Sequence, residues 1–237
     1  MQKKTLINYW NKFYKKNSIR SESTFAKFTY KKIKNLKGKI LDIGCGNGRD
    51  AYFFNKKGFN VVGIDISQKA IQKNSKVKIK NLVFKKFDVG KDKIKSKFEI
   101  IYCRFFVHTL DESLENKLID IIKKAKKKNT IVFFEFRNYK DKIFGNFKAS
   151  DHNKMIEFEK GHLRRIIDPK VFKKKFTFRT KSKIIYQKSG INLSVIKKDK
   201  LQNSEFISKN EFYFPSGLGL TLKEQKFVKD TVISILK

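Results

Sequence analysis

Short apolar runs alternate with segments of helical periodicity along most of the chain. The runs are apolar almost without interruption, as expected of strands that are buried in a sheet. The segments between them repeat apolar residues every three or four positions, which is typical of helices. This alternation predicts an α/β fold, with a mostly parallel sheet and helices on both of its faces. We expect strands at 39–43, 59–65, 82–87, 98–102 and 130–136, helices at 49–57, from Ser67, at 112–127 and at 168–176, and an antiparallel hairpin at 179–187 and 191–197 that closes a seven-stranded sheet.

Further segments lie outside this alternating pattern. Segments 3–16 and 21–35 have the apolar spacing of amphipathic helices, and the first is rich in aromatic residues. The stretch 137–167 is polar, irregular and longer than a usual connection, so we expect it to be functional or mobile. We therefore divide the chain into an N-terminal helical part at 1–37, a domain at 38–197 and a tail at 198–237, which is expected to carry an amphipathic helix.

Composition narrows the class of protein. The 237 residues suit one domain with an appendage, or at most two small domains, and a hydrophobic content of 40% excludes a disordered chain. No apolar run approaches the roughly 20 residues of a membrane span, and the N-terminus lacks the apolar region of a signal peptide. Cys45 and Cys103 are too few for a disulfide scaffold, and His108, His152 and His162 are too scattered for a metal site. We therefore expect a cytoplasmic protein without a metal ion.

The formal net charge of +35 has two interpretations. A large positive charge attracts polyanions, which would indicate a nucleic-acid or anionic-surface binder. However, only seven of the 57 basic residues are Arg, and the lysines are spread along the chain. This diffuse pattern favours compositional drift towards Lys at solvated positions. RNA binding stays open as the alternative.

The most informative stretch is the glycine loop that follows the first strand. The sequence Gly44-Cys45-Gly46-Asn47-Gly48 separates a strand from a helix, and closely spaced glycines let a ligand approach the backbone. Asp65 lies 21 residues after Gly44, at the end of the next strand, where a carboxylate can accept both hydroxyls of a ribose. The spacing is neither that of the dinucleotide fingerprint nor that of a P-loop. The alternative is a loop that serves only as a turn.

Four motifs in order resemble class I S-adenosylmethionine-dependent methyltransferases, over about residues 38–197. Residues 41–48 resemble their first motif, and Asp65 resembles their second acidic position. Asp88, after the third strand, resembles the residue that contacts adenine, and 98–108 resembles their fourth motif. The resemblance implies a Rossmann-like methyltransferase fold and S-adenosylmethionine as the methyl donor, which leaves as S-adenosylhomocysteine. It also implies a set of cofactor-binding residues, namely Asp42, Gly44, Cys45, Gly46, Gly48, Asp65, Ile66, Asp88, Val89, Arg104 and Phe105.

Segments at 9–14, 23–26, 47–50 and 104–108 further resemble a bacterial subgroup linked to capsule, lipopolysaccharide and other surface-glycan pathways. The subgroup implies that the helices of 1–37 fold over the cofactor as a lid. It favours O-methylation of a small polar acceptor, such as a sugar, a nucleotide-sugar or a phosphate-bearing glycan precursor. An RNA methyltransferase and a non-catalytic binding partner with the same fold are the alternatives.

The acceptor side is predicted from basic residues after the fifth strand. Arg137, Arg164 and Arg165 suggest an anionic substrate, because the planar guanidinium binds phosphate or carboxylate in a way that Lys cannot. The alternative is a charge pair on a solvated loop. His162 is our first candidate for a general base and for a substrate contact, since neighbouring arginines would keep it neutral, and His108 is the second. An acidic acceptor would need no base. Tyr14, on the lid, is the remaining predicted substrate contact.

Overall fold

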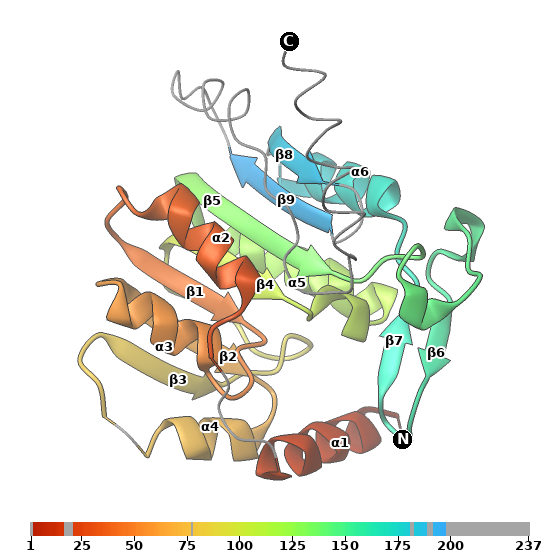
Figure 1. Cartoon of the computed structure of the whole chain (residues 1–237), viewed down its shortest axis with the longest axis horizontal. Coiled ribbons are helices and arrows are strands. Elements are labelled where there is room, and N and C mark those ends of the chain that lie inside the picture. The colour runs from red at the N-terminus through yellow and green to blue at the C-terminus, as the bar shows by residue number, and fades with distance from the viewer. Residues whose placement is uncertain (1, 17–20, 77, 181–182, 189–191, 198–237) are drawn as a thin grey trace, which may run out of the picture.

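The computed structural model describes residues 2–16, 21–76, 78–180, 183–188 and 192–197. Its centre is a sheet of parallel strands, as predicted (Figure 1). A hairpin pairs antiparallel with the last of these strands, which gives the order β3-β2-β1-β4-β5-β9-β8. The parallel strands are β1 (Lys39–Ile43), β2 (Asn60–Asp65), β3 (Leu82–Lys86), β4 (Phe98–Arg104) and β5 (Lys126–Phe136), and the hairpin consists of β8 (Lys183–Lys188) and β9 (Asn192–Lys197).

The helices lie close to their predicted positions, and side chains cap several of them. Ser67 accepts a hydrogen bond from Ala70 N, which confirms its predicted role as the N-cap of α4. The helix after β4 ends two residues earlier than predicted because β5 begins at once, at Lys126. The α-helices are α1 (Gln2–Lys16), α2 (Thr24–Ile33), α3 (Arg49–Lys56), α4 (Gln68–Asn74), α5 (Glu112–Ala125) and α6 (Pro169–Thr180).

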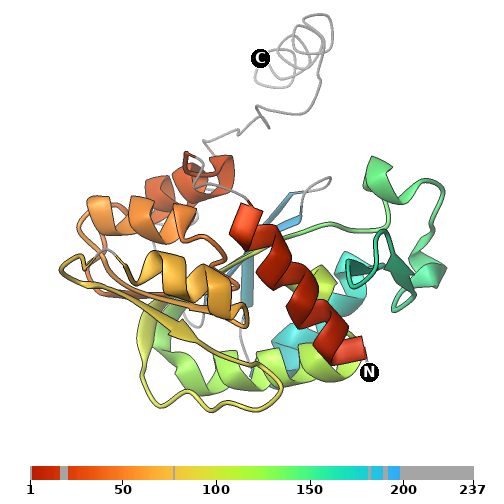
Figure 2. The same cartoon turned by 90° about the horizontal axis from the view of Figure 1, so that it is seen from below.

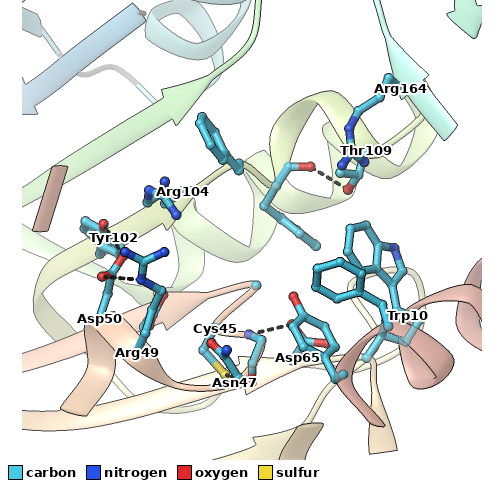
Figure 3. Close-up of a pocket in the computed structure, with 18 residues that line it drawn as sticks. Trp10, Cys45, Asn47, Arg49, Asp50, Asp65, Tyr102, Arg104, Thr109 and Arg164 are labelled. Carbon is cyan, nitrogen blue, oxygen red and sulfur yellow. Dashed lines mark hydrogen bonds and ion pairs between the residues drawn. The ribbon is translucent and has the colours of Figure 1, made fainter. Parts of the chain in front are cut away.

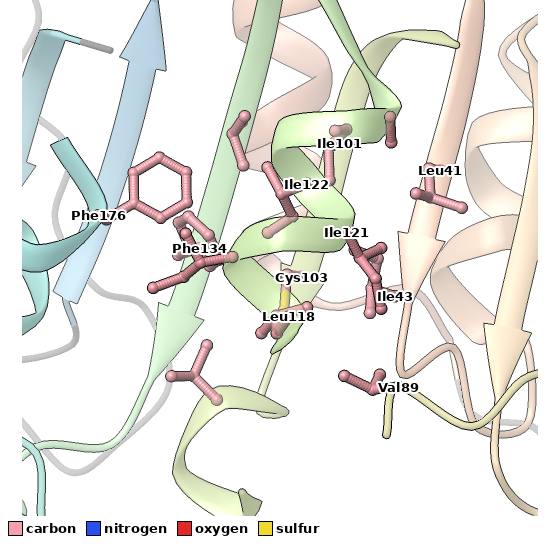
Figure 4. Packing of buried hydrophobic residues seen from close by; sticks show 14 of the residues in the cluster. Leu41, Ile43, Val89, Ile101, Cys103, Leu118, Ile121, Ile122, Phe134 and Phe176 are labelled. Atoms are coloured by element: carbon pink, nitrogen blue, oxygen red, sulfur yellow. The ribbon is translucent and has the colours of Figure 1, made fainter. Parts of the chain in front are cut away.

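Alternation along the central strands divides the core into two layers. On one face, residues of α5 and α6 pack against the sheet, with Leu118 and Phe176 beside Phe134 of β5 (Figure 4). On the other face, α2 and α3 pack against Phe133 and Tyr102. Successive strand residues point to opposite faces, so neighbours such as Phe133 and Phe134 serve different layers. Cys103 is fully buried in the first layer, where it acts as a small apolar side chain.

The stretch 137–167 is more regular than predicted. It contains a second hairpin, β6 (Met155–Glu157) and β7 (Leu163–Arg165), and short 3-10 turns. Arg165 is fully buried and forms an ion pair and a hydrogen bond with Glu115 of α5. This pair anchors the hairpin to the domain. The pattern of apolar residues did not predict this hairpin, because strands of only three residues are too short to show an alternation.

Helix α1 crosses the molecule near the carboxyl ends of the parallel strands, with the β6–β7 hairpin at its N-terminal end (Figures 1 and 2). It packs mainly on α4. Asn11 Oδ1 accepts hydrogen bonds from Ser67 Oγ at 2.9 Å and Lys69 N at 3.2 Å, and Lys73 Nζ donates to Tyr14 O at 2.7 Å. These contacts fix both the middle and the C-terminal end of α1. Across the described ranges, no helix is both long and apolar enough to cross a membrane. The predicted tail at 198–237 lies outside the described residues.

Candidate active site

The glycine loop between β1 and α3 borders a cavity of about 260 Å³ (Figure 3). Gly44, Gly46 and Gly48 all have positive φ angles, which residues other than glycine rarely adopt. Space is equally restrictive, because a Cβ atom on Gly44 would lie 2.7 Å from the Phe106 ring. A Cβ atom on Gly46 would overlap the hydroxyl of Tyr14. The loop therefore depends on glycine twice, for its backbone angles and for close packing.

Asp65 connects this loop to the end of β2. Its Oδ2 accepts a hydrogen bond from Gly46 N at 2.9 Å, and its Oδ1 accepts one from Ser67 N at 2.8 Å. Each carboxylate oxygen keeps a second lone pair for a ligand in the cavity. Burial raises the pKa of Asp65, while the backbone hydrogen bonds oppose that shift. The side chain is thus fixed in place, with acceptor capacity on the cavity wall.

A narrow second cavity of about 40 Å³ adjoins the main cavity, with which it shares lining residues. It is mostly apolar, and a carboxylate stands at its edge: Asp88 Oδ1 accepts a hydrogen bond from Gly90 N at 2.8 Å. The lining suits a heterocycle, because it combines apolar side chains with a carboxylate that could accept from an exocyclic amine. The lining residues are Leu6, Trp10, Ile66, Phe87, Asp88, Val89, Gly90, Phe106, Thr109, Leu110 and Leu114, of which Trp10, Ile66, Phe106 and Thr109 also line the main cavity.

The end of the main cavity that lies away from Trp10 is lined by charged side chains. Figure 3 shows Arg49, Asp50, Tyr102 and Arg104 gathered there, away from Trp10 and Arg164. Arg104 Nε lies 2.6 Å from Glu135 Oε2 in an ion pair that lacks the alignment of a hydrogen bond. Nearby, Asp42 is buried, and its pKa is raised well above the usual range by burial and by the adjacent Asp50 and Asp65 carboxylates. Groups of both signs at one end of a cavity suit a zwitterion.

Phe105 follows β4 and has an unusual backbone conformation. Its φ angle is +50°, which is strained for a residue with a side chain. The guanidinium carbon of Arg104 lies 4.3 Å from the centre of the Phe105 ring, and that of Arg137 lies 5.2 Å from it. Phe105 also lines the main cavity. The strain and the two cations around the ring are features typical of a functional position.

Arg164 of β7 reaches the same cavity from the hairpin. Its guanidinium lies 5.4 Å from the centre of the Trp10 ring, and Nη1 donates a hydrogen bond to the carbonyl of Leu163. No carboxylate pairs with it within the described part of the chain. Burial and the nearby Arg137 lower the pKa of Arg164 to about 10, although two tyrosines oppose the shift. A guanidinium this poorly compensated is suited to an anion.

Both candidate histidines are neutral, and neither belongs to the cavity wall among the described residues. His162 stacks on Tyr9 with ring centres 4.7 Å apart, and burial, with a smaller contribution from Arg164, lowers its pKa to about 4. Burial and the nearby Arg164 and Arg137 hold the pKa of His108 well below its usual range. Its Nδ1 accepts a hydrogen bond from Arg137 N at 3.2 Å. A neutral imidazole that accepts at Nδ1 carries its proton on Nε2.

Comparison with known proteins identifies the family. Residues 16–175, about two thirds of the chain, match the methyltransferase domain family. The chain belongs to this family. The predicted enzyme class, an S-adenosylmethionine-dependent methyltransferase, is therefore confirmed, and S-adenosylmethionine is its cofactor.

The individual proteins that resemble this methyltransferase have low sequence identity to it or match only part of it. A segment of 109 residues is 33% identical to a ubiquinone biosynthesis O-methyltransferase of Rickettsia akari, covering 40% of this chain and 42% of that protein. The chain thus matches less than half the length of that relative. Two of the solved structures that share the fold illustrate the low identity. An S-adenosylmethionine-dependent methyltransferase of Methanosarcina mazei has a TM-score of 0.57 at 17% identity, covering 68% of this chain and 92% of that one. The glycopeptide N-methyltransferase MtfA, in complex with S-adenosylhomocysteine, has a TM-score of 0.61 at 13% identity, covering 75% and 89%.

The residues of this methyltransferase fit its cofactor in three parts. The narrow cavity with Asp88 and Val89 suits adenine, Asp65 suits the ribose hydroxyls, and the charged end suits the amino and carboxyl groups of the methionine part. Most of the predicted cofactor residues lie on these walls. The main cavity is lined by Asp42, Gly44, Cys45, Gly46, Asp65, Ile66, Arg104 and Phe105, and Ile66 also lines the narrow cavity. Gly48 lines neither cavity in the described structure and forms the N-cap of α3, at the end of the glycine loop. Within the described residues, no cluster of three or more acidic, His or Cys side chains could hold a metal ion.

The predicted acceptor residues are only partly brought together. Arg164 lines the cavity, whereas Arg137 lies above Phe105 and pairs through Nη1 with Asp141 at 2.7 Å. Tyr14 lies over the glycine loop, and burial raises its pKa well above the usual range. The prediction for Arg165 is wrong, because this side chain is fully buried and paired with Glu115. A solvated loop was the alternative considered for it, and it is wrong for the same reason.

Sequence reasoning missed several residues of the cavity wall. Arg49 and Asp50 directly follow the glycine loop, so their position alone could have indicated them. Trp10 and Phe13 lie on the face of α1 that also carries Tyr14, and their helical spacing was the available signal. Tyr102 gave no such signal, because within an apolar strand it resembles a core residue.

Proposed function

We propose that this methyltransferase transfers a methyl group from S-adenosylmethionine to an oxygen atom of a small anionic acceptor. When bound, the cofactor supplies an electrophilic methyl group on a sulfonium. The observation that carries the choice of acceptor is Arg164, a poorly compensated guanidinium on the cavity wall. Because a partly buried cation without a carboxylate partner in the described part of the chain is unfavourable, such a group is best explained by a negatively charged ligand.

Among the acceptors predicted from the sequence, this favours a nucleotide-sugar or a phosphate-bearing glycan precursor over a neutral sugar. A planar guanidinium can bind two oxygens of a phosphate or carboxylate at once. The partial likeness to an O-methyltransferase supports oxygen as the acceptor atom. The cavity also has an aromatic wall, with Trp10, Phe13 and Phe105, on which a sugar or a base could pack.

The role of the protein in this reaction is mainly to orient the two substrates. Asp65, Asp88 and the glycine loop would hold the cofactor, and Arg164 would hold the acceptor against it. His108 is a poor general base, because its Nδ1 lone pair is used by Arg137 N and its Nε2 carries the proton. His162 stays our candidate if a base is needed, since its Nε2 has no hydrogen-bond partner among the described residues. An acceptor that is already ionised would need neither.

A turnover assay tests the proposal. The release of S-adenosylhomocysteine is measured with nucleotide-sugars, sugar phosphates, neutral sugars and RNA as acceptors. We expect turnover with a phosphate-bearing acceptor, and a rise in KM of at least tenfold in Arg164→Gln with unchanged affinity for S-adenosylhomocysteine. Arg179→Gln, which removes a surface guanidinium paired with Asp120, is the matched control. Turnover with neutral sugars alone, or methylation of RNA with a steep salt dependence, would overturn the choice of acceptor.

A further inference from the structure

The charged end of the main cavity contains a hydrogen-bonded group that the cofactor contacts described above do not use. Asp50, in the first turn of α3, is only 5% exposed. Its Oδ1 accepts a hydrogen bond from Ser23 N at 2.8 Å. Its Oδ2 accepts from Ser23 Oγ at 2.7 Å and from Tyr102 OH at 2.8 Å. A buried carboxylate that accepts hydrogen bonds from three neutral donors is firmly held in place.

The three members of this group come from distant parts of the fold. Ser23 precedes α2 and caps it, because Ser23 Oγ also accepts a hydrogen bond from Ala26 N. Tyr102 lies in β4, where it is 1% exposed. Its hydroxyl lies 3.2 Å from Ser23 Oγ, so each member contacts the other two. The group therefore ties the start of α2 and the central sheet to the first turn after the glycine loop.

The Asp50 carboxylate also faces the side chain of Arg49. Arg49 Nε lies 3.7 Å from Asp50 Oδ1, in an ion pair without a hydrogen bond among the described residues. Both side chains line the cavity, at the end opposite Trp10 (Figure 3). The ion pair restricts where the Arg49 guanidinium can lie, and the three donors on Asp50 prevent the carboxylate from turning to follow it. Arg49 is thus held beside the cavity by a partner that is itself fixed.

We propose that Ser23, Asp50 and Tyr102 are positioning residues that orient Arg49 towards the carboxylate of the amino-acid part of the cofactor. With adenine at Asp88 and ribose at Asp65, the amino-acid part reaches this charged end of the cavity. The effect of the group is then confined to ligands that carry the amino-acid part. This inference concerns the cofactor and does not depend on which acceptor is used.

Two ligands that differ only at that part test the inference. S-adenosylhomocysteine has the amino-acid group, whereas 5′-methylthioadenosine retains adenine, ribose and sulfur without it. Calorimetry on the full chain should give about tenfold weaker binding of S-adenosylhomocysteine to Tyr102→Phe, with binding of 5′-methylthioadenosine unchanged within about twofold. Tyr30→Phe, which removes a hydroxyl from α2 away from the cavity, should change neither affinity.

Ser23 provides the second arm, in case the tyrosine variant unfolds. Ser23→Ala should show the same selective loss, and Ser23→Thr, which keeps the hydroxyl, should restore affinity for S-adenosylhomocysteine. Arg49→Gln should also lose affinity selectively, and adding Tyr102→Phe to it should cause little further loss, because the tyrosine acts through the arginine. Equal weakening of both ligands would reduce the group to a purely structural role. Unchanged affinities, or additive losses in the double variant, would overturn the inference as well.

Discussion

The glycine loop and the β6–β7 hairpin face the same cavity, but different kinds of interaction hold them. The loop is fixed by backbone groups, through Gly46 N on Asp65 and Gly44 N on the carbonyl of Ile64. The hairpin is held by side chains, through the buried ion pair of Arg165 and the stacking of His162 on Tyr9. Backbone contacts require particular conformations, whereas side-chain contacts can be replaced by others. The comparison suggests that the cofactor side tolerates little change and that the acceptor side can diverge.

Two adjacent arginines of the hairpin give the largest expected effect. Arg165→Ala leaves the carboxylate of Glu115 buried, with Lys175 as its one remaining cationic partner among the described residues, so we expect a loss of about 3–5 kcal/mol in the free energy of unfolding. Arg164→Ala should lose less than about 1 kcal/mol, since Arg164 forms no ion pair within the described part of the chain. Chemical denaturation measures both. Similar losses in the two variants would contradict the separation of structural and acceptor-binding roles.

Two glycines with positive φ angles test the cofactor side. Gly46→Ala strains the backbone and drives a methyl group into Tyr14, so we expect affinity for S-adenosylhomocysteine to fall about a hundredfold. Gly58 has a φ of +89°, but apart from its chain neighbours no heavy atom of the described residues lies within 4 Å of the position of its added Cβ. Gly58→Ala should therefore keep the affinity and lose only about 1 kcal/mol of stability. If both variants bind equally well, crowding by α1 does not shape the loop.

Asp65 links the loop to the ribose. Asp65→Ala removes two backbone hydrogen bonds and the proposed ribose contacts, and we expect affinity for S-adenosylhomocysteine to fall by about 1.5–3 kcal/mol. Calorimetry on the variant and on Asp120→Ala, a surface control, measures the difference. Unaltered binding in Asp65→Ala would show that the ribose lies elsewhere.

The same contrast explains what could be predicted from the sequence. The cofactor side was predictable because its requirements are local: glycines at fixed spacing, and Asp65 and Asp88 at strand ends. The strands of the sheet were predictable from their apolar runs. The hairpin was not, because its strands are three residues long and its stability comes from Arg165 reaching Glu115, 50 residues away. Adjacent arginines look alike in a sequence, and only the packing separates Arg164 from Arg165.

The smallest expected effect is a change of stability with pH, at the contact between α1 and the β6–β7 hairpin. His162 has a pKa of about 4, against 6.5 for an ordinary histidine, so the folded protein binds fewer protons there than the unfolded chain. Its contribution to stability is therefore complete above pH 6.5, declines as the pH falls towards 4, and then levels off. Protonation also adds a cation beside Arg164, which should weaken the stacking on Tyr9.

Trp10 reports on this contact directly, because it is the single tryptophan of the chain and its ring centre lies 6.0 Å from that of His162. We expect its fluorescence to change with a midpoint near pH 4, while far-UV circular dichroism stays constant over the same range. His162→Gln should abolish the transition and His152→Gln should retain it, because His152 accepts a hydrogen bond from Asp168 N and is not among the described rings that contact Tyr9. A transition that persists in His162→Gln would show that another group titrates near Trp10, and would overturn the assignment to His162.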